Sequence, residues 1–200
     1  MTSIGIVCAM DEEVQKIVSA FELQPLETHL GYKVYQNNHI TLIESSIGKV
    51  ASSLAATTLI DKFNITQLIN IGLAGALKPI PAGSAYFVSS VTQHDAFIPF
   101  DEYQQDMYQS IECQIPDHAK NTLVLTTGDQ FITNSNDINN SADIVDMEGF
   151  AVAYVANRYN LPITMIKGVS DDANNSSESE LFENLNLAMD QTITLLKQVI

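Results

Sequence analysis

Basic residues are scarce in this chain. The chain has nine basic residues, of which Arg158 is the only arginine, and 24 acidic residues. Its formal net charge at pH 7 is −15. Binding to nucleic acid or to an anionic membrane depends on clustered lysine and arginine. Phosphate sites are also built from cations, arginine above all. The composition therefore argues against nucleic acid and membrane partners, and against phosphate as a co-substrate.

Cysteines and long apolar runs are also few. Cys8 and Cys113 lack the spacing of a zinc site, and the four histidines are scattered, so the sequence predicts no metal site. Free thiols suit a reducing compartment. No apolar run approaches the ~18 residues of a membrane span, and residues 1–7 lack the basic segment of a secretory signal. We expect a cytoplasmic protein without a cofactor.

Short apolar segments are what the chain has in abundance, with 46% apolar residues. Segments with strand character alternate with segments of helical spacing, which is typical of an α/β fold. We therefore expect one α/β domain over residues 1–200, with a central mixed, twisted sheet flanked by helices. The predicted strands are 3–9, 32–36, 39–45, 67–71, 85–91, 121–127 and 162–169, and the predicted helices are 11–21, 50–63, 148–159 and 181–199.

Two other segments have little periodicity. Residues 92–120 are polar and mixed, and we expect a long loop or a short helix there, of the kind that is often functional. Residues 134–143 are rich in Asn, Ser and Asp and predict a surface loop. Asp11 is placed to cap the helix predicted for residues 11–21.

Carboxylates stand where apolar strands end. Glu12 and Glu13 follow the first strand, Glu148 stands where a strand gives way to a predicted helix, and Asp171 follows the strand 162–169. Ligands of open α/β sheets bind at such strand ends. Each acid alone equally suits a solvated helix start or loop, but a buried unpaired carboxylate is costly. Their joint occurrence predicts a site that handles a neutral polar ligand by hydrogen bonding and proton transfer.

Two common site motifs are missing. The glycines of Gly72-Leu73-Ala74-Gly75 follow a strand but lack the spacing of a nucleotide-phosphate loop. They predict either a tight turn or a turn that lets backbone approach a ligand. Ser170 has no histidine nearby in the sequence, which disfavours a Ser-His-Asp hydrolase.

Six segments, taken together and in order, carry a resemblance to a known family. They are Ile4-Gly5-Ile6-Val7-Cys8-Ala9-Met10-Asp11-Glu12-Glu13-Val14, Ser46-Ile47-Gly48-Lys49-Val50-Ala51, Ile69-Asn70-Ile71-Gly72-Leu73-Ala74-Gly75, Thr127-Gly128-Asp129-Gln130-Phe131-Ile132, Val145-Asp146-Met147-Glu148-Gly149 and Val169-Ser170-Asp171. The chain resembles the purine nucleoside phosphorylase/nucleosidase superfamily nearly end to end. Within it, the chain looks most like the 5'-methylthioadenosine/S-adenosylhomocysteine nucleosidases.

The resemblance implies a set of roles. Glu13 acts on the attacking water, Asp171 protonates N7 of adenine, and Glu148 binds the ribose hydroxyls. Ser170 steadies the acid, Met147 packs on the sugar, and Phe131-Ile132 contact the base. The implied substrate-binding residues are Met10, Ile47, Ala74, Gly75, Phe131, Ile132, Met147, Glu148, Ser170 and Phe182. A homodimer is implied as well, because residues 94–100 resemble the loop that reaches the partner's alkylthio pocket.

The implied reaction is hydrolysis of the N-glycosidic bond of 5'-methylthioadenosine or S-adenosylhomocysteine. Asp11, Glu12 and Glu13 would repel phosphate, which favours water over phosphorolysis. Leu73 and Lys167 depart from the family pattern of a small polar residue and an arginine, and both changes touch water positioning. Three alternatives stay open: a nucleosidase for another 5'-modified nucleoside such as futalosine, a phosphorylase, and a nucleoside-binding protein without turnover.

Overall fold

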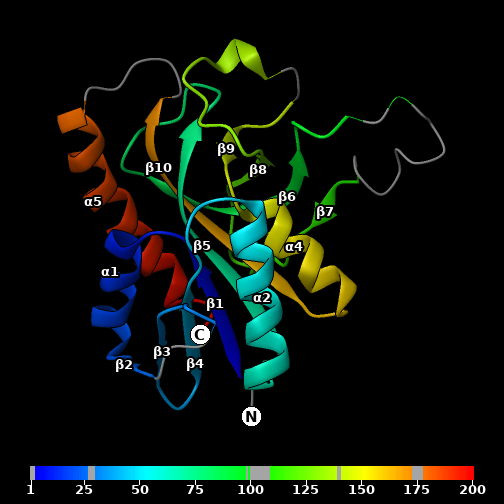
Figure 1. The fold of residues 1–200 in the computed structure, drawn as a ribbon. Coiled ribbons are helices and arrows are strands. Elements are labelled where there is room, and N and C mark those ends of the chain that lie inside the picture. Colours follow the sequence, from blue (N-terminus) through cyan, green and yellow to red (C-terminus); the bar gives the residue numbers. More distant parts are fainter. Residues whose placement is uncertain (1–2, 27–29, 98, 100–108, 139–140, 173–177) are drawn as a thin grey trace.

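The computed structural model describes residues 3–26, 30–97, 99, 109–138, 141–172 and 178–200, without the side chains of 171–172 and 178–183. A sheet runs through the molecule, with helices on both sides of it (Figure 1). Helices α1 (Asp11–Phe21) and α5 (Glu178–Leu196) lie on one side, and α2 (Lys49–Phe63) and α4 (Gly149–Arg158) lie on the other. The predicted α/β fold with a mixed, helix-flanked sheet is confirmed.

The strands form a single sheet of mixed direction. Strand β1 pairs in parallel with β4 and with β5, and β3 and β4 form the hairpin predicted around Asn37-Asn38. The strands are β1 (Ile4–Cys8), β2 (Gln24–Pro25), β3 (Val34–Gln36), β4 (Ile40–Glu44), β5 (Gln67–Ala76), β6 (Ala85–Gln93), β7 (Ile111–Glu112), β8 (Thr122–Thr127), β9 (Ile144–Asp146) and β10 (Ile163–Asp172).

Part of the sheet curls into a closed ring of strands. Strand β5 pairs with β10, β10 with β6, β6 with β8, β8 with β9, and β9 returns to β5. Strands β1, β5 and β10 are mutually parallel, so their carboxyl ends meet at one edge. The predicted carboxylate site therefore lies where the ring joins the flat part of the sheet.

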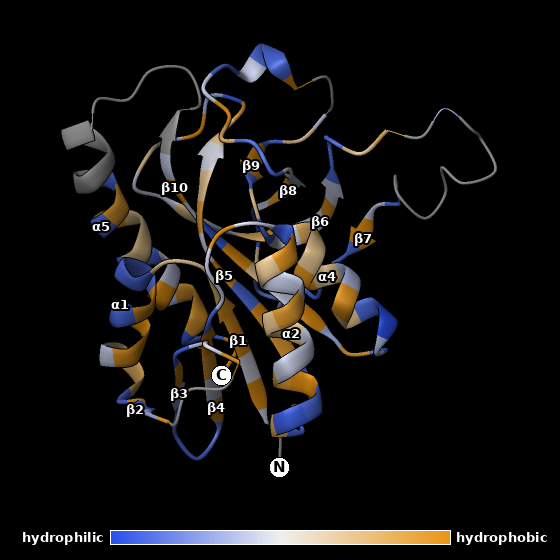
Figure 2. Cartoon of the chain, in the orientation of Figure 1, coloured by the Kyte–Doolittle hydropathy of each residue, from blue (hydrophilic) through white to orange (hydrophobic). Residues whose placement is uncertain are grey.

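Two apolar cores lie on opposite faces of the sheet. In β1, Ile4, Ile6 and Cys8 belong to the core beneath α1 and α5, whereas Val7 belongs to the core beneath α2 and α4. A strand buried on both faces reads as a continuous apolar run, which explains the pattern of residues 4–8. The apolar residues gather along the central strands and the inward helix sides (Figure 2).

The structure corrects three local predictions. Residues 72–75 form no turn, because β5 continues through them to Ala76 and pairs with β10 and β9. The short strand β7 lies where no strand was predicted, whereas β9 is the strand expected to end just before Glu148. Asp11 does not cap α1, since the capping residue is Met10, whose N–H donates to Glu13.

The two segments of little periodicity are described only in part. The loop predicted at 134–143 holds the single-turn helix Ser135–Asp137 in its described part. Much of the 92–120 segment, including 98 and 100–108, lies outside the described residues. In the part of the chain that the structure describes, none of the helices combines the length and apolar character needed to cross a membrane.

Candidate active site

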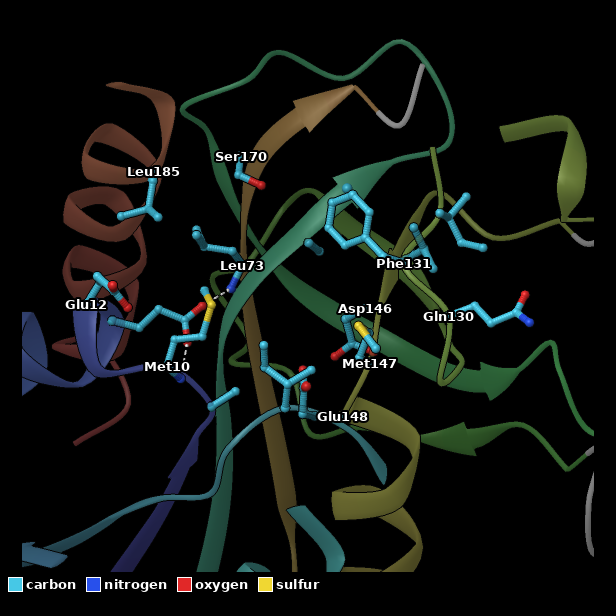
Figure 3. Close-up of a pocket in the computed structure, with 17 residues that line it drawn as sticks. Met10, Glu12, Leu73, Gln130, Phe131, Asp146, Met147, Glu148, Ser170 and Leu185 are labelled. Atoms are coloured by element: carbon cyan, nitrogen blue, oxygen red, sulfur yellow. Dashed lines mark hydrogen bonds between the residues drawn. The ribbon is translucent and has the colours of Figure 1, made fainter. Parts of the chain in front are cut away.

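A cavity of about 310 Å³ opens at the carboxyl ends of β1 and β5. Its volume lies at the lower end of the range typical of small-molecule sites. In Figure 3, Phe131 and Gln130 stand on one side, Leu185, Glu12 and Leu73 stand on the other, and Glu148 lies below them. The cavity brings together the following predicted residues: Met10, Glu13, Ile47, Ala74, Gly75, Phe131, Ile132, Met147, Glu148 and Ser170.

Two predicted residues cannot be placed at the cavity in this way. The side chains of Asp171 and Phe182 lie outside the described residues. The backbone of Asp171 belongs to β10 and pairs with Gly75, after a bulge that follows Val169. Bulges often re-aim side chains beside active sites, and Ser170, at this bulge, is buried and lines the cavity.

The carboxylate of Glu13 is buried and held by three donors. The N–H of Leu73 donates to Oε1 at 2.8 Å, and the N–H of Met10 donates to Oε2 at 3.1 Å. The thiol of Cys8 lies 3.4 Å from Oε2. Gly72 leaves room for the group, because a Cβ there would lie 3.1 Å from Oε1.

The pKa of Glu13 reflects opposing influences. Burial raises this pKa above its ordinary value, whereas the donors from Leu73, Met10 and Cys8 and the charge of Lys167 favour the ionised form and oppose the rise. A carboxylate with a raised pKa is a stronger base than an exposed one. Because Leu73 holds Glu13 through its backbone, the departure of its side chain from the family pattern leaves this contact intact.

Glu148 stands at the start of α4, and its Oε1 accepts the N–H of Gly48 at 2.8 Å. Gly48 has φ +102°, a conformation that side-chain-bearing residues rarely adopt. Burial, and then the charge of Asp146, raise the pKa of Glu148 to about 7, although Lys167 and the Gly48 N–H oppose the rise. Glu148 therefore titrates near neutrality.

A buried ion pair lies beneath these carboxylates. Lys167 Nζ is 2.8 Å from Asp146 Oδ2, and each side chain is only 1% exposed. Asp146 also accepts the Thr127 hydroxyl and the Gly149 N–H, so it fixes the start of α4. Burial alone would lower the pKa of Lys167, but Asp146, Glu148 and Glu13 together raise it. Lys167 is the counter-charge that lets three acids share one site.

Sequence reasoning missed several residues of this site. Leu185 was given no role, and five residues were quoted only within motifs: Ala9, Gly48, Gln130, Val145 and Asp146. One signal was available, because Lys167 interrupts an otherwise apolar strand. A lysine in such a position is almost never fully buried unless it is paired, so an acidic partner could have been sought.

A closed ring of strands joins a sheet whose parallel strands end at a cavity lined by carboxylates. This arrangement is that of a nucleoside phosphorylase-like protein. The chain belongs to the phosphorylase superfamily, whose family model matches residues 3–200. Curated relatives are 5'-methylthioadenosine/S-adenosylhomocysteine nucleosidases. That of Shewanella frigidimarina is 31% identical over 87% of this chain and 88% of its own, and that of Pseudoalteromonas translucida is 29% identical over 93% and 91%.

Solved structures agree with this assignment. The 5'-methylthioadenosine/S-adenosylhomocysteine nucleosidase of S. pneumoniae, solved with a transition-state inhibitor, superposes with a TM-score of 0.84 at 26% identity, covering 98% of this chain and 96% of that one. Futalosine hydrolase of Helicobacter pylori gives 0.84 at 24% identity, covering 98% and 96%. The latter likeness shows the fold alone.

Proposed function

We propose that the protein hydrolyses the N-glycosidic bond of 5'-methylthioadenosine and S-adenosylhomocysteine, releasing adenine and the thioribose. One observation carries the proposal: the carboxylate of Glu13 is buried at the cavity and is held by the Leu73 and Met10 N–H groups, which suits it to act as a base. The relatives that share the chain nearly end to end bear the name of this activity. The ionisable side chains among the described lining residues are all carboxylates, which supports water over phosphate.

The proposed reaction breaks the bond between C1' of the ribose and N9 of adenine. The bonding electrons pass to the base, which takes a proton at N7 from Asp171, and the sugar becomes positively charged. Glu13 takes a proton from a water whose oxygen bonds to C1'. The carboxylate of Glu148 binds the ribose hydroxyls and faces the developing charge, an arrangement that favours the transition state over the substrate.

The remaining lining residues would hold the two ends of the substrate. Phe131 and Ile132 would contact the base, and the exposed ring of Phe131 offers a flat apolar surface for stacking. Met10, Leu73 and Leu185 line the cavity on the other side and would receive the apolar thio substituent. Phe182 is proposed to extend this pocket.

Substrate choice and mechanism are tested by one panel. Adenine or hypoxanthine release would be measured from methylthioadenosine, S-adenosylhomocysteine, inosine and futalosine, each with and without phosphate, in wild type and Asp171→Asn. We expect phosphate-independent release of adenine that the variant loses. Release from futalosine alone would favour the alternative nucleosidase, and release that depends on phosphate would favour a phosphorylase. Adenine binding without any release would favour a binding protein.

The role of Glu148 predicts a pH dependence. The ionised carboxylate accepts the Gly48 N–H and the ribose hydroxyls more strongly than the protonated carboxyl group does, and burial raises its pKa to about 7. The KM for methylthioadenosine should therefore rise as the pH falls through this range. Steady-state kinetics of wild type and Glu148→Gln would measure it, and the variant should lose the dependence. A wild-type KM that is constant from well below to well above pH 7 would contradict the prediction.

The raised pKa of Glu148 also makes the stability of the fold depend on pH. Its pKa rises from 4.5 to about 7 on folding, so the folded protein binds more protons than the unfolded chain between these values. The contribution of Glu148 to stability is therefore present at low pH and is lost as the pH rises through about 7.

The thiol of Cys8 is expected to lower the pKa of Glu13. Replacing Cys8 with alanine removes a donor to the ionised carboxylate, so the pKa of Glu13 should rise further. The acid limb of the kcat/KM profile should move to higher pH. Cys8→Ser, which keeps a donor, should stay near wild type, as should Cys113→Ala at the other buried thiol. A Cys8→Ala profile identical to wild type would show that the thiol does not act on Glu13.

We also propose a cytoplasmic homodimer. The two described cysteines are free thiols, which suits a reducing compartment. Helices α2 and α4 pack side by side and leave exposed the apolar side chains of Val50, Leu54 and Tyr154. Exposed apolar patches often mark protein interfaces.

Sedimentation velocity tests the dimer. Val50 is 81% exposed in one chain, so Val50→Asp should cost little in the folding of the monomer but should disrupt an apolar interface. We expect wild type to sediment as a dimer and the variant to shift toward monomer. Wild type that remains monomeric at micromolar concentration would contradict the proposal.

A further inference from the structure

Three charged residues form a cluster beside the cavity without lining it. Lys49 Nζ lies 2.6 Å from Asp95 Oδ1 and 3.5 Å from Asp129 Oδ2. The Lys49 side chain is only 19% exposed although it carries a charge. None of the three residues is among those that line the cavity. We call this group, Lys49, Asp95 and Asp129, the Lys49 clamp.

Backbone hydrogen bonds complete the clamp. The N–H of Lys49 donates to Asp129 Oδ1 at 3.0 Å, and the N–H of Asp129 donates to Asp95 Oδ2 at 2.8 Å. The start of α2, the segment after β6 and the segment after β8 are thereby tied together. Each carboxylate serves two donors, so moving any one segment breaks contacts to both of the others.

The clamp stands between the two halves of the proposed substrate site. The residue before Lys49 is Gly48, whose N–H holds Glu148 at 2.8 Å. The residues after Asp129 are Gln130, Phe131 and Ile132, which all line the cavity. One clamp residue is thus the chain neighbour of the ribose-carboxylate contact, and another precedes the base-contacting segment.

Phe131 needs support from outside its own contacts. Its side chain is 71% exposed, so packing of the ring does little to fix the segment that carries it. Ordering a loop on binding costs conformational entropy, and a loop that is already fixed avoids that cost. Polar contacts at Asp129, two residues before Phe131, can supply this fixation.

We propose that Lys49, Asp95 and Asp129 are positioning residues that hold the base-contacting residues 130–132 in register with the ribose-binding Glu148. The inference rests on the proposed function, because it gives the two halves of the cavity to the base and the sugar. The clamp residues do not line the cavity, so the clamp would act through Phe131 and Gly48. A purely structural alternative is that Asp129 only stabilises the start of α2, because its carboxylate accepts the Lys49 N–H there.

A double-mutant cycle separates the two roles. Adenine affinity would be measured by titration calorimetry for wild type, Lys49→Met, Phe131→Ala and the double variant. We expect Lys49→Met to raise the dissociation constant at least about fivefold, the low end of coupling between linked sites. Phe131→Ala should weaken binding in the wild-type background but much less in Lys49→Met, because the ring is already misplaced there.

Two further variants provide a control and an independent test of the clamp. Lys62→Met removes an exposed lysine from the last turn of the same helix and should leave adenine affinity unchanged. Asp129→Asn keeps the shape of the residue and should reproduce the effect of Lys49→Met, even if the latter folds poorly. Thermal unfolding of each variant reports helix stability separately from ligand binding.

The outcomes are distinct. Non-additive effects of Lys49→Met and Phe131→Ala would support the clamp. Effects that simply multiply, or a loss of thermal stability with unchanged adenine affinity, would overturn it and leave a helix-capping role. A wild type that neither binds adenine nor releases it from any nucleoside would overturn the proposed function, and the inference with it.

Discussion

Glu13→Gln is expected to lower adenine release by roughly a hundredfold to ten-thousandfold, the usual contribution of a positioned general base. The amide cannot accept the proton of water, although it fills the same space beside the Leu73 and Met10 N–H groups. The loss should appear in kcat more than in KM, because the charge on the sugar and the attack of water belong to the transition state.

The neighbouring acid provides the control. Glu12 also lines the cavity but is exposed, unlike the buried Glu13. Glu12→Gln should therefore retain activity to within a few fold. If the single-turnover rate constant of Glu13→Gln equalled that of wild type, the proposed base would be wrong. The Glu13 contacts would then serve only to cap α1.

Lys167→Met is expected to lower the free energy of unfolding by about 3–5 kcal/mol, as when one member of a buried ion pair is removed. The ammonium pairs with Asp146 and also faces Glu148 and Glu13. Without it, three buried carboxylates would be left with no cation among them. Urea denaturation would measure the loss, and it should shrink at low pH, where the carboxylates become protonated.

A surface pair supplies the comparison. Lys16 pairs with Asp190 at 2.6 Å, but its partner is 64% exposed. Lys16→Met should cost no more than about 1 kcal/mol, because water already solvates such pairs. The double variant Lys167→Met/Asp146→Asn should recover part of the stability. A Lys167→Met loss as small as that of Lys16→Met would mean that water reaches the buried pair.

Local pattern predicted the four long helices and most of the longer strands. The helical spacing of Val14, Ile17, Val18 and Phe21 predicts α1 to its bounds, because one apolar face must meet the core. Strand β5 was predicted too short, since glycines suggest a turn. In the structure, pairing with β10 on one side and β9 on the other outweighs that local preference.

The site depended on more than local pattern. Resemblance to a family located Glu13 and Glu148, but no spacing in the sequence pairs Lys167 with Asp146. That pair exists because β9 and β10 both adjoin β5, a relation set by the closed ring. The contact between Gly48 and Glu148 and the Lys49 clamp depend in the same way on segments far apart in the chain.

The closed ring also determines when the site can form during folding. Strands β1, β4 and β5 are near one another in sequence and can pair early, whereas β10 must return from far along the chain to close the ring. Contacts of such long range slow folding. A nascent chain whose β1 and β5 have left the ribosome already contains Glu13. The side of β5 that later pairs with β10 is still an unpaired edge at that stage, and such edges favour aggregation. Because Ser170 of β10 lines the cavity, we expect substrate binding to stabilise the protein only after β10 has docked.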